Sequence, residues 1–270
     1  MEPLTGDKIK ELLNSMRNIL INFADKNYRN SQVRNSTSAL MYGFDSAHQY
    51  SPKDIDSSFY SKNKSILDQK RGCGYWLWKP YFILKNLELL NKEDILFYSD
   101  SGADIIKDFS PIIEKIRNSE QGVCPFSLTG NHKEFQYTKR DLFVALDLDN
   151  EEFSESKQVM ASFIGFRKTD FSINFCREYL KYAQIEQLIT DSPSKKENYK
   201  GFKDHRHDQS IFSLLCKKNN LPLTEDPTQW GQRHKELHPR HQFIWHRRNN
   251  NSIKVEPRNL EGVPVRLIVG

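Results

Sequence analysis

The stretch Ile95-Leu-Phe-Tyr-Ser-Asp-Ser-Gly102 constrains the fold more than any other part of the sequence. It begins with a short, continuous run of apolar and aromatic residues, which is typical of a strand buried on both faces of a parallel sheet. The run stops abruptly at Asp100, and a glycine follows soon after. Ligands of open parallel sheets bind just beyond the carboxyl ends of the strands, so Asp100 is a candidate binding residue.

A second apolar run with the same kind of ending lies near the start of the chain. Asn18-Ile-Leu-Ile-Asn-Phe-Ala24 is followed by Asp25, which predicts another buried strand with a carboxylate at its carboxyl end. A helix is expected over about residues 31–42 and a short strand within residues 43–50. This β-α-β order favours a parallel sheet with crossover helices.

The rest of the chain continues this alternation of helices and strands. We expect helices at 9–16, in part of 52–70, from Pro80 to about 90, and at 110–119, 138–148, 170–188 and 211–216, with strands at 122–128 and 160–167. Residues 71–74 are interpreted as a flexible hinge and residues 191–203 as a polar loop. A single domain over residues 1–270 is expected at this length.

The composition indicates a globular protein and leaves several kinds of partner open. Hydrophobic residues make up 37% of the chain and aromatic residues 12%, enough for a substantial core. Because no apolar run is long enough for a membrane span or a signal peptide, we expect a cytoplasmic protein, free or peripherally attached to a membrane. The 4 scattered cysteines predict free, mostly buried thiols. A net charge of +5 suits a phosphate-bearing ligand, an anionic membrane or weak nucleic-acid contact.

The residues around Asp100 suit a phosphate-bearing ligand accompanied by a divalent cation. A carboxylate is a common metal ligand, and Gly102 lets the backbone approach a phosphate closely. Asp104 is a second candidate carboxylate, and His246, which follows the apolar Phe243-Ile-Trp245, is a candidate to complete the coordination. The alternative is an ordinary Asp-Ser-Gly turn, with Asp104 capping the next segment.

The aromatic segment Tyr75-Trp-Leu-Trp-Lys-Pro80 lies between the expected hinge and the helix that follows it. Lys79 is a candidate phosphate contact, and the ring of Trp76 or Trp78 is a candidate to stack on a base or a sugar. Because residues two apart share a face of an extended segment, we expect the two indoles on one side. The alternative is that at least one of them packs in the core.

His205-Arg-His-Asp-Gln-Ser210 is a dense polar run at the expected start of a helix. Helix N-termini favour anionic groups, and Asp208 is a candidate general base, with helix capping as its alternative role. His207 is a second catalytic candidate. The histidine spacings fit no compact zinc motif, so no structural zinc site is expected.

Four motifs, with Asn22-Phe-Ala-Asp25, together resemble a family of glycosyltransferases found in bacteria and large viruses. They are Arg71-Gly-Cys-Gly-Tyr-Trp-Leu-Trp-Lys-Pro80, Asp94-Ile-Leu-Phe-Tyr-Ser-Asp-Ser-Gly102, Thr138-Lys-Arg-Asp-Leu-Phe143 and His205-Arg-His-Asp-Gln-Ser-Ile-Phe-Ser-Leu-Leu215. The likeness covers roughly residues 18–218. It implies an α/β fold of the GT-A type, with a Rossmann-like, mostly parallel central sheet flanked by helices. The nucleotide-binding half would span about 18–105 and the acceptor-side half about 106–270.

The resemblance also implies an activity in glycan biosynthesis: transfer of a hexose or pentose from a nucleotide-diphosphate sugar, UDP- or GDP-linked, to a glycan or lipid-linked acceptor, without a nucleic-acid partner. The implied donor-binding residues are Ala24, Asp25, Lys79, Asp100, Ser101, Gly102 and Gln209. Acceptor binding would use Trp78 and Arg206, and catalysis Asp208 and His207. The family's Asp-x-Asp motif holds Mn²⁺ or Mg²⁺. Here Gly102 stands at the second aspartate, so Asp104, His246 or water must supply the missing ligands.

Two other functions are compatible with parts of the sequence. A metal-dependent phosphohydrolase or nuclease would use His205, His207 and Asp208, and it needs further carboxylates that the sequence does not point to. A carbohydrate- or nucleic-acid-binding module would use the aromatic and basic C-terminal part, including Arg247 and Arg248, and would leave the strand-end aspartates without a role.

Overall fold

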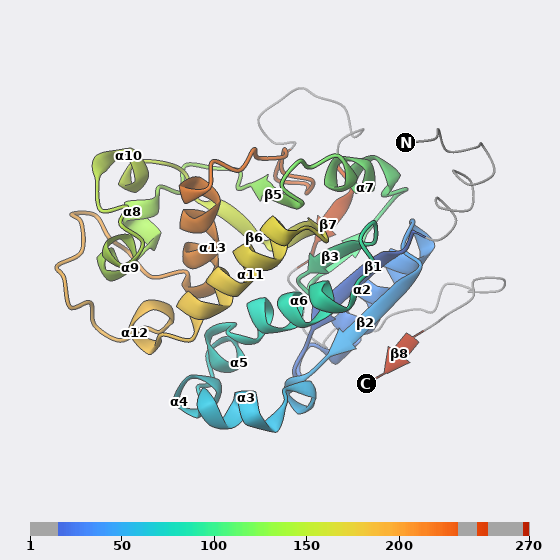
Figure 1. The fold of residues 1–270 in the computed structure, drawn as a ribbon, viewed down its shortest axis with the longest axis horizontal. Helices are drawn as coiled ribbons and strands as arrows, with labels where there is room; N and C mark the ends of the chain where they lie inside the picture. Colours follow the sequence, from blue (N-terminus) through green and yellow to red (C-terminus); the bar gives the residue numbers. More distant parts are fainter. Residues whose placement is uncertain (1–15, 232–241, 248–266, 270) are drawn as a thin grey trace.

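The fold is organised around a six-stranded sheet with the strand order β5-β6-β3-β1-β2-β8 (Figure 1). The computed structural model describes residues 16–231, 242–247 and 267–269, so the helix expected at 9–16 lies outside the described residues except for Met16. The strands are β1 Asn18–Phe23, β2 Ser46–Tyr50, β3 Ile95–Ser99, β5 Val123–Ser127, β6 Val159–Arg167 and β8 Leu267–Val269. A separate antiparallel pair is formed by β4 Ala103–Ile105 and β7 Ile244–His246.

The helices lie between these strands in the chain. The longer ones are α2 Arg29–Met41, α6 Trp78–Leu89, α7 Ser110–Arg117, α11 Asp170–Ala183 and α13 His207–Lys218. The shorter ones are η1 Pro52–Asp54, α3 Ser57–Lys62, α4 Lys64–Leu67, α5 Gly72–Tyr75, α8 Glu134–Tyr137, α9 Arg140–Ala145, α10 Glu151–Ser154 and α12 Glu186–Ile189. Among the described residues, most of the expected elements form, with ends within a few residues of the prediction.

Most strands of the sheet run in one direction. β3, β1, β2 and β8 are paired in parallel, β6 runs antiparallel to β3, and β5 antiparallel to β6. The reversed strand β6 therefore begins at the edge of the sheet where β3 ends. The α/β fold with a mostly parallel, helix-flanked central sheet, expected from the sequence, is confirmed. The two expected halves of the chain share this sheet, since β5 and β6 follow residue 106.

Each face of the sheet carries its own hydrophobic core. Along β1, Ile19, Ile21 and Phe23 face the core covered by α6, α11 and α13, whereas Leu20 faces the opposite core beside α7. In β3, Leu96 and Tyr98 face the first of these cores, and Ile95 and Phe97 face the second. Because side chains of a strand alternate between faces, a continuous apolar run is what a sheet covered on both sides requires.

One long helix expected from the sequence is two helices in the structure. The pattern predicted a helix over 170–188, but α11 ends at Ala183 and α12 begins at Glu186, with Ile185 in an extended conformation. The break turns Leu188 and Ile189 into the core, where both are buried. Their carbonyl groups then bond to histidine rings at the start of α13. The burial of these two side chains and the hydrogen bonds of their carbonyl groups explain why the chain breaks here and does not continue as one helix.

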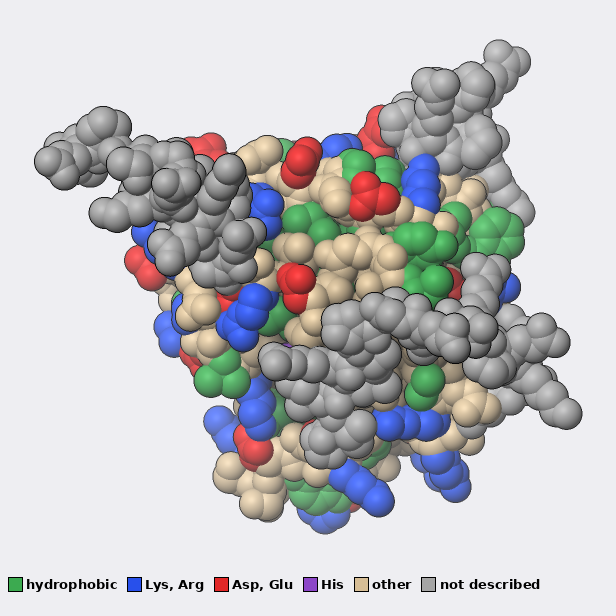
Figure 2. Space-filling model, turned by 90° about the vertical axis from the view of Figure 1, so that its right-hand side faces the viewer, with side chains coloured by type: hydrophobic (Ala, Val, Ile, Leu, Met, Phe, Trp, Pro, Cys, Tyr) green, Lys and Arg blue, Asp and Glu red, His purple; other side chains and the backbone are tan. Residues whose placement is uncertain are grey.

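The thiols, the apolar character of the helices and the surface charges complete the description of the fold. The cysteines are free thiols, and Cys124, Cys176 and Cys216 are buried, as expected. Among the described residues, no helix combines the length and the apolar character that crossing a membrane requires. In the described part of the face seen in Figure 2, basic and acidic side chains are interspersed with hydrophobic ones. A mixed pattern of this kind produces little long-range field of one sign there.

Candidate active site

The carboxyl ends of β1 and β3 lie side by side at a point where the strand order reverses. The chain passes from β1 to β2 on one side and then crosses to β3 on the other side of β1. Such a reversal opens a crevice beyond the strand ends, where α/β sheets bind ligands. Ala24 and Asp25 follow β1, and Asp100 follows β3. All three line one cavity of about 550 Å³, which we call the switch-point cavity.

Asp100 is held in place by the backbone of the neighbouring strand. Its N–H donates to the carbonyl oxygen of Ser162 over 2.8 Å, so the start of β6 fixes the residue beyond the end of β3. The hydroxyl of Tyr98 donates to Asp100 Oδ1 over 2.6 Å. The ammonium of Lys79 lies 3.7 Å from the same oxygen. Asp100 is thus a positioned carboxylate with a cation beside it, and not merely the first residue of a turn.

Lys79 links this carboxylate to a second one. Its side chain is buried in the first turn of α6, and Nζ lies 2.6 Å from Asp208 Oδ2 and donates to the carbonyl oxygen of Ala161 over 3.1 Å. Burial alone would lower the pKa of Lys79, but the carboxylates of Asp208 and Asp100 outweigh it, and the pKa is raised. Lys79 therefore stays charged between two aspartates.

Asp208 lies in the first turn of α13 and is also buried. Burial raises its pKa, Lys79 opposes this rise, and the hydroxyl of Tyr179 donates to Oδ2 over 3.2 Å. Asp208 is not the residue before the helix, which is Arg206, and the side chain of Asp208 bonds Lys79 and Tyr179, so the alternative of a simple helix cap is not what is observed. Asp100, Lys79 and Asp208 form one group, which we call the ion-pair triad.

The two histidines of the same run are occupied by backbone groups. In His205, Nδ1 accepts from the N–H of Lys139 over 3.2 Å and Nε2 lies 2.8 Å from the carbonyl oxygen of Leu188. In His207, Nδ1 lies 2.8 Å from the carbonyl oxygen of Ile189. Burial lowers the pKa of His205 to about 3 and also lowers that of His207. Both ring nitrogens of His205 are therefore occupied, and it is a poor ligand for the metal that a phosphohydrolase or nuclease would need, whereas Nε2 of His207 has no hydrogen-bond partner among the described residues.

The expected hinge at 71–74 is a left-handed turn. Residues 72–76 all have positive φ, including Cys73 at 51° and Trp76 at 60°. Left-handed non-glycine residues cost roughly 1–2 kcal/mol each, and such strain is concentrated at functional sites. The turn makes the indole of Trp76 stack on His207 at 5.4 Å. The two tryptophans therefore do not share an extended segment: Trp78 lies in α6, stacked on Phe23 at 3.8 Å.

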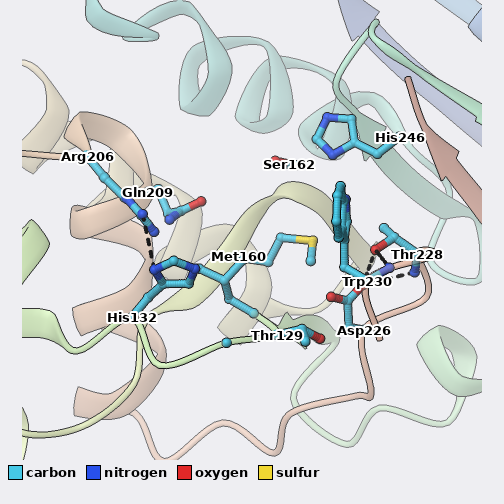
Figure 3. Close-up of a pocket in the computed structure, with 12 residues that line it drawn as sticks. Thr129, His132, Met160, Ser162, Arg206, Gln209, Asp226, Thr228, Trp230 and His246 are labelled. Atoms are coloured by element: carbon cyan, nitrogen blue, oxygen red, sulfur yellow. Dashed lines mark hydrogen bonds between the residues drawn. The ribbon is translucent and has the colours of Figure 1, made fainter. Parts of the chain in front are cut away.

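Three neighbouring cavities lie along this edge of the sheet, and the ion-pair triad lines the central one. The central one, of about 210 Å³, is lined by the triad together with Trp76, Arg206, His207 and Gln209. It shares Trp76 and Asp100 with the switch-point cavity. It shares Ser162, Arg206 and Gln209 with a cavity of about 620 Å³ beyond the end of β5, which we call the far cavity (Figure 3). The triad thus lies between two larger spaces along one edge of the sheet.

The structure brings together nearly all of the site residues expected from the sequence. Ala24, Asp25, Trp78, Asp100, Ser101, Gly102 and His246 line the switch-point cavity, and Lys79, Arg206, His207, Asp208 and Gln209 line the central one. Asp104 lies elsewhere, in β4. Its Oδ1 accepts from Arg34 Nε over 2.6 Å and its Oδ2 accepts from Arg247 Nε.

These positions bear directly on the expected metal site. Both carboxylate oxygens of Asp104 are paired with guanidinium groups, and Asp104 does not line the cavity that contains Asp100, so it is not placed to share a metal with Asp100. In the described part of the chain, no three His, Cys, Asp or Glu side chains form a group that could hold a metal ion. Asp100 and His246 nevertheless border the same cavity. Mg²⁺ sites commonly combine one or two carboxylates with substrate phosphates, and Asp100 is a carboxylate of this kind.

Sequence reasoning missed several residues that complete the site. Tyr98 and Tyr179 bond the triad, and the far cavity is lined by His132, Asp226 and Trp230. The two tyrosines lie inside buried elements, where the sequence pattern predicts that an aromatic residue packs in the hydrophobic core. The segment around Asp226 has no periodic pattern, so no local signal distinguishes it from an ordinary loop.

No family model matches the chain, and no curated protein matches it. Among solved structures, it is similar to the apo bifunctional glycosyltransferase WbbM, with 12% identity and a TM-score of 0.47, covering 84% of this chain and 40% of that one. It is also similar to mouse xyloside xylosyltransferase 1 (10%, 0.44, covering 85% and 97%) and to the glycosyltransferase GlyE of Streptococcus pneumoniae TIGR4 (13%, 0.40, covering 78% and 46%). The chain therefore spans less than half of the WbbM and GlyE chains. Similarity of this degree does not assign a substrate.

Proposed function

We propose that this chain is a glycosyltransferase that moves a sugar from a nucleotide-diphosphate sugar to a hydroxyl acceptor. The observation that carries the proposal is the ion-pair triad, which lines the central cavity between the switch-point cavity and the far cavity. Group transfer between two substrates requires two binding spaces that open onto one reacting centre. The sequence resemblance to glycosyltransferases, whose motifs contain the three triad residues, agrees with this proposal.

The switch-point cavity is the proposed donor site. Its volume of about 550 Å³ lies within the range of cofactor-sized pockets. Ala24 and Asp25 would contact the base and ribose of a UDP- or GDP-sugar, with the diphosphate near Ser101 and Gly102. Lys70 lines the same cavity and supplies a positive charge for that diphosphate. Trp78 lines this cavity and not the far one, so its proposed role moves from the acceptor to the donor.

The far cavity is the proposed acceptor site, for a glycan or a lipid-linked sugar. It reaches the triad through Arg206 and Gln209, which line both the far and the central cavities. An acceptor bound there would present a hydroxyl group towards the space between Asp100 and Asp208. The same arrangement gives Gln209 a role near both substrates, as the resemblance implies.

The chemistry requires a base and a compensating positive charge. The acceptor oxygen forms a bond to the anomeric carbon, the bond from that carbon to the diphosphate breaks, and the hydroxyl proton must be removed. Asp208 is the proposed base, because a raised pKa makes a carboxylate a stronger proton acceptor. Lys79 keeps a positive charge at the centre while negative charge moves to the leaving diphosphate.

A divalent cation fits the proposed donor site only with the help of the substrate. Asp100 and His246 would hold Mn²⁺ or Mg²⁺ together with diphosphate oxygens, and Asp104 would not take part. Such an ion would neutralise charge on the leaving group.

Thermal shift with nucleoside diphosphates tests the donor site. We expect UDP or GDP, with Mn²⁺, to raise the melting temperature, and we expect Asp100→Asn to remove most of this rise. Asp104→Asn is the matched control: it starts from a lower melting temperature because Arg34 and Arg247 lose the negative charge of their partner, but it keeps the nucleotide-induced rise. Absence of a rise with UDP, GDP, CDP and dTDP, or an equal rise in Asp100→Asn, would count against the proposal.

A further inference from the structure

Asp226 is a buried carboxylate that the proposed reaction does not use. The residue is 6% exposed, and it lines the far cavity. Its Oδ1 accepts from both the N–H and the hydroxyl of Thr228, over 2.9 and 2.7 Å. Its Oδ2 is buried and has no hydrogen-bond partner among the described residues. A buried polar atom without a partner costs roughly 1–3 kcal/mol, so this oxygen requires an explanation.

The loop that carries Asp226 is fixed on both sides. The N–H of Ser127 donates to the carbonyl oxygen of Thr224 over 2.8 Å, which ties the loop to the end of β5. The N–H groups of Phe243 and Ile244 donate to the carbonyl oxygen of Pro227, which ties it to β7. The side chain of Gln229 bonds both backbone groups of His246. A carboxylate held this way cannot easily relax towards another partner, and the site is preorganised.

The far cavity has two chemically different walls. Figure 3 shows Asp226, Thr228 and Trp230 on one side and the other wall, His132, Arg206 and Gln209, across the cavity, with Met160 between them. One carboxylate oxygen of Asp226 points to Thr228, and the other lies on the side of Met160. The first wall thus offers an aromatic ring beside a hydrogen-bond acceptor, and the second offers donors.

We propose that the far cavity recognises the terminal pyranose of a carbohydrate acceptor, with one sugar hydroxyl donating to Asp226 Oδ2 and the sugar ring packed on Trp230. This inference rests on the proposed function and specifies its acceptor. A carboxylate oxygen only accepts hydrogen bonds, so the ligand must present a donor. A pyranose combines hydroxyl donors with an apolar C–H face, which suits the neighbouring indole. Its other hydroxyls can accept from Arg206 and Gln209.

Asp226→Asn is the decisive variant because it changes one atom. The N–H of Thr228 needs an acceptor, so the amide oxygen of Asn takes the place of Oδ1 and the loop keeps its bonds. The amide nitrogen then replaces Oδ2, and an acceptor becomes a donor. Glu225→Gln removes the same charge from the preceding, exposed residue and serves as the control.

The probes are p-nitrophenyl pyranosides of glucose, galactose, mannose and N-acetylglucosamine, with binding measured by saturation-transfer NMR on the full chain. We expect at least one to bind the wild-type protein and Glu225→Gln equally, and to bind Asp226→Asn at least about tenfold more weakly. Trp230→Ala should weaken the same probe. Some probes should also serve as acceptors in the transfer reaction. For these, the ratio of sugar transferred to the probe to sugar lost by donor hydrolysis should fall in Asp226→Asn and in Trp230→Ala.

Two results would overturn the inference: no pyranoside binds at millimolar concentration, or Asp226→Asn binds as the control does. Failure of the proposed function has a different signature. If nucleoside diphosphates give no thermal shift while pyranoside binding still depends on Asp226, the cavity is a sugar site but the transferase proposal fails. If nucleotides bind and pyranosides do not, the transferase proposal stands and the inference about the acceptor fails.

Discussion

Replacing Lys79 by methionine tests the ion-pair triad as a physical unit. Lys79 and Asp208 are 3% and 4% exposed, and their charged atoms lie 2.6 Å apart. Methionine retains most of the aliphatic stem, so packing changes little while the ammonium is lost. Asp208 is then left buried without its cation.

The expected loss follows from these distances. At an effective dielectric constant of about 20, two unit charges at this separation attract by ~6 kcal/mol, of which desolvation consumes a large part. Removing one partner of a buried pair typically costs about 3–5 kcal/mol, because the other charge remains. We therefore expect Lys79→Met to lower the free energy of unfolding by that amount.

The loss should depend on pH with a definite sign. Burial raises the pKa of Asp208, and Lys79 opposes the rise. A carboxylate with a raised pKa binds more protons when folded, so stability falls as the pH rises from the unfolded pKa to the folded pKa. Without Lys79 this window extends to higher pH. Lys79→Met should therefore lose more stability at pH 8 than at pH 5.

Urea unfolding followed by tryptophan fluorescence measures both effects. The double variant Lys79→Met/Asp208→Asn removes the unpaired charge, and we expect it to recover at least half of the loss. A deficit below ~1 kcal/mol for Lys79→Met, or a double variant no more stable than the single one, would refute the view that the two charges hold each other in place.

Two further predictions concern stability. His205 has a pKa lowered to about 3, so the folded state resists protonation, and its stability should be intact above the unfolded pKa and fall as the pH drops below it. Between pH 7 and 4.5 the wild type should lose about 2–3 kcal/mol more than His205→Gln in urea unfolding; parallel curves would contradict this. Gly74 has φ of 93°, and a Cβ there would lie 2.7 Å from the Cα of Leu67. Gly74→Ala should lower stability by at least about 2 kcal/mol. The loss should exceed that of Gly43→Ala, where φ is also positive but the atom nearest to an added Cβ is 3.7 Å away. Equal losses of stability would mean that the turn around Gly74 shifts to accommodate the Cβ.

The sequence alone was sufficient for the elements and the edge of the sheet that carries the site. The apolar run at 95–99 forms β3 with the predicted bounds, and the run before Asp25 forms β1. Strand and helix formation depends on the residues within one short segment, and burial on both faces of a sheet leaves a continuous apolar pattern. Because the carboxyl ends of parallel strands share one edge, Asp25 and Asp100 could be expected in one cavity.

Only the tertiary structure decided what each polar side chain does. The sequence made Lys79 a candidate phosphate contact and Asp104 a candidate metal ligand, and both roles stay predictions. Only the fold shows that Lys79 pairs with Asp100 and Asp208 and that Asp104 bonds Arg34 and Arg247. The unpartnered oxygen of Asp226 could not be foreseen at all. The partners of a buried charge come from segments far apart in the chain, and their approach depends on the packing of the whole sheet and its helices. No local pattern records it.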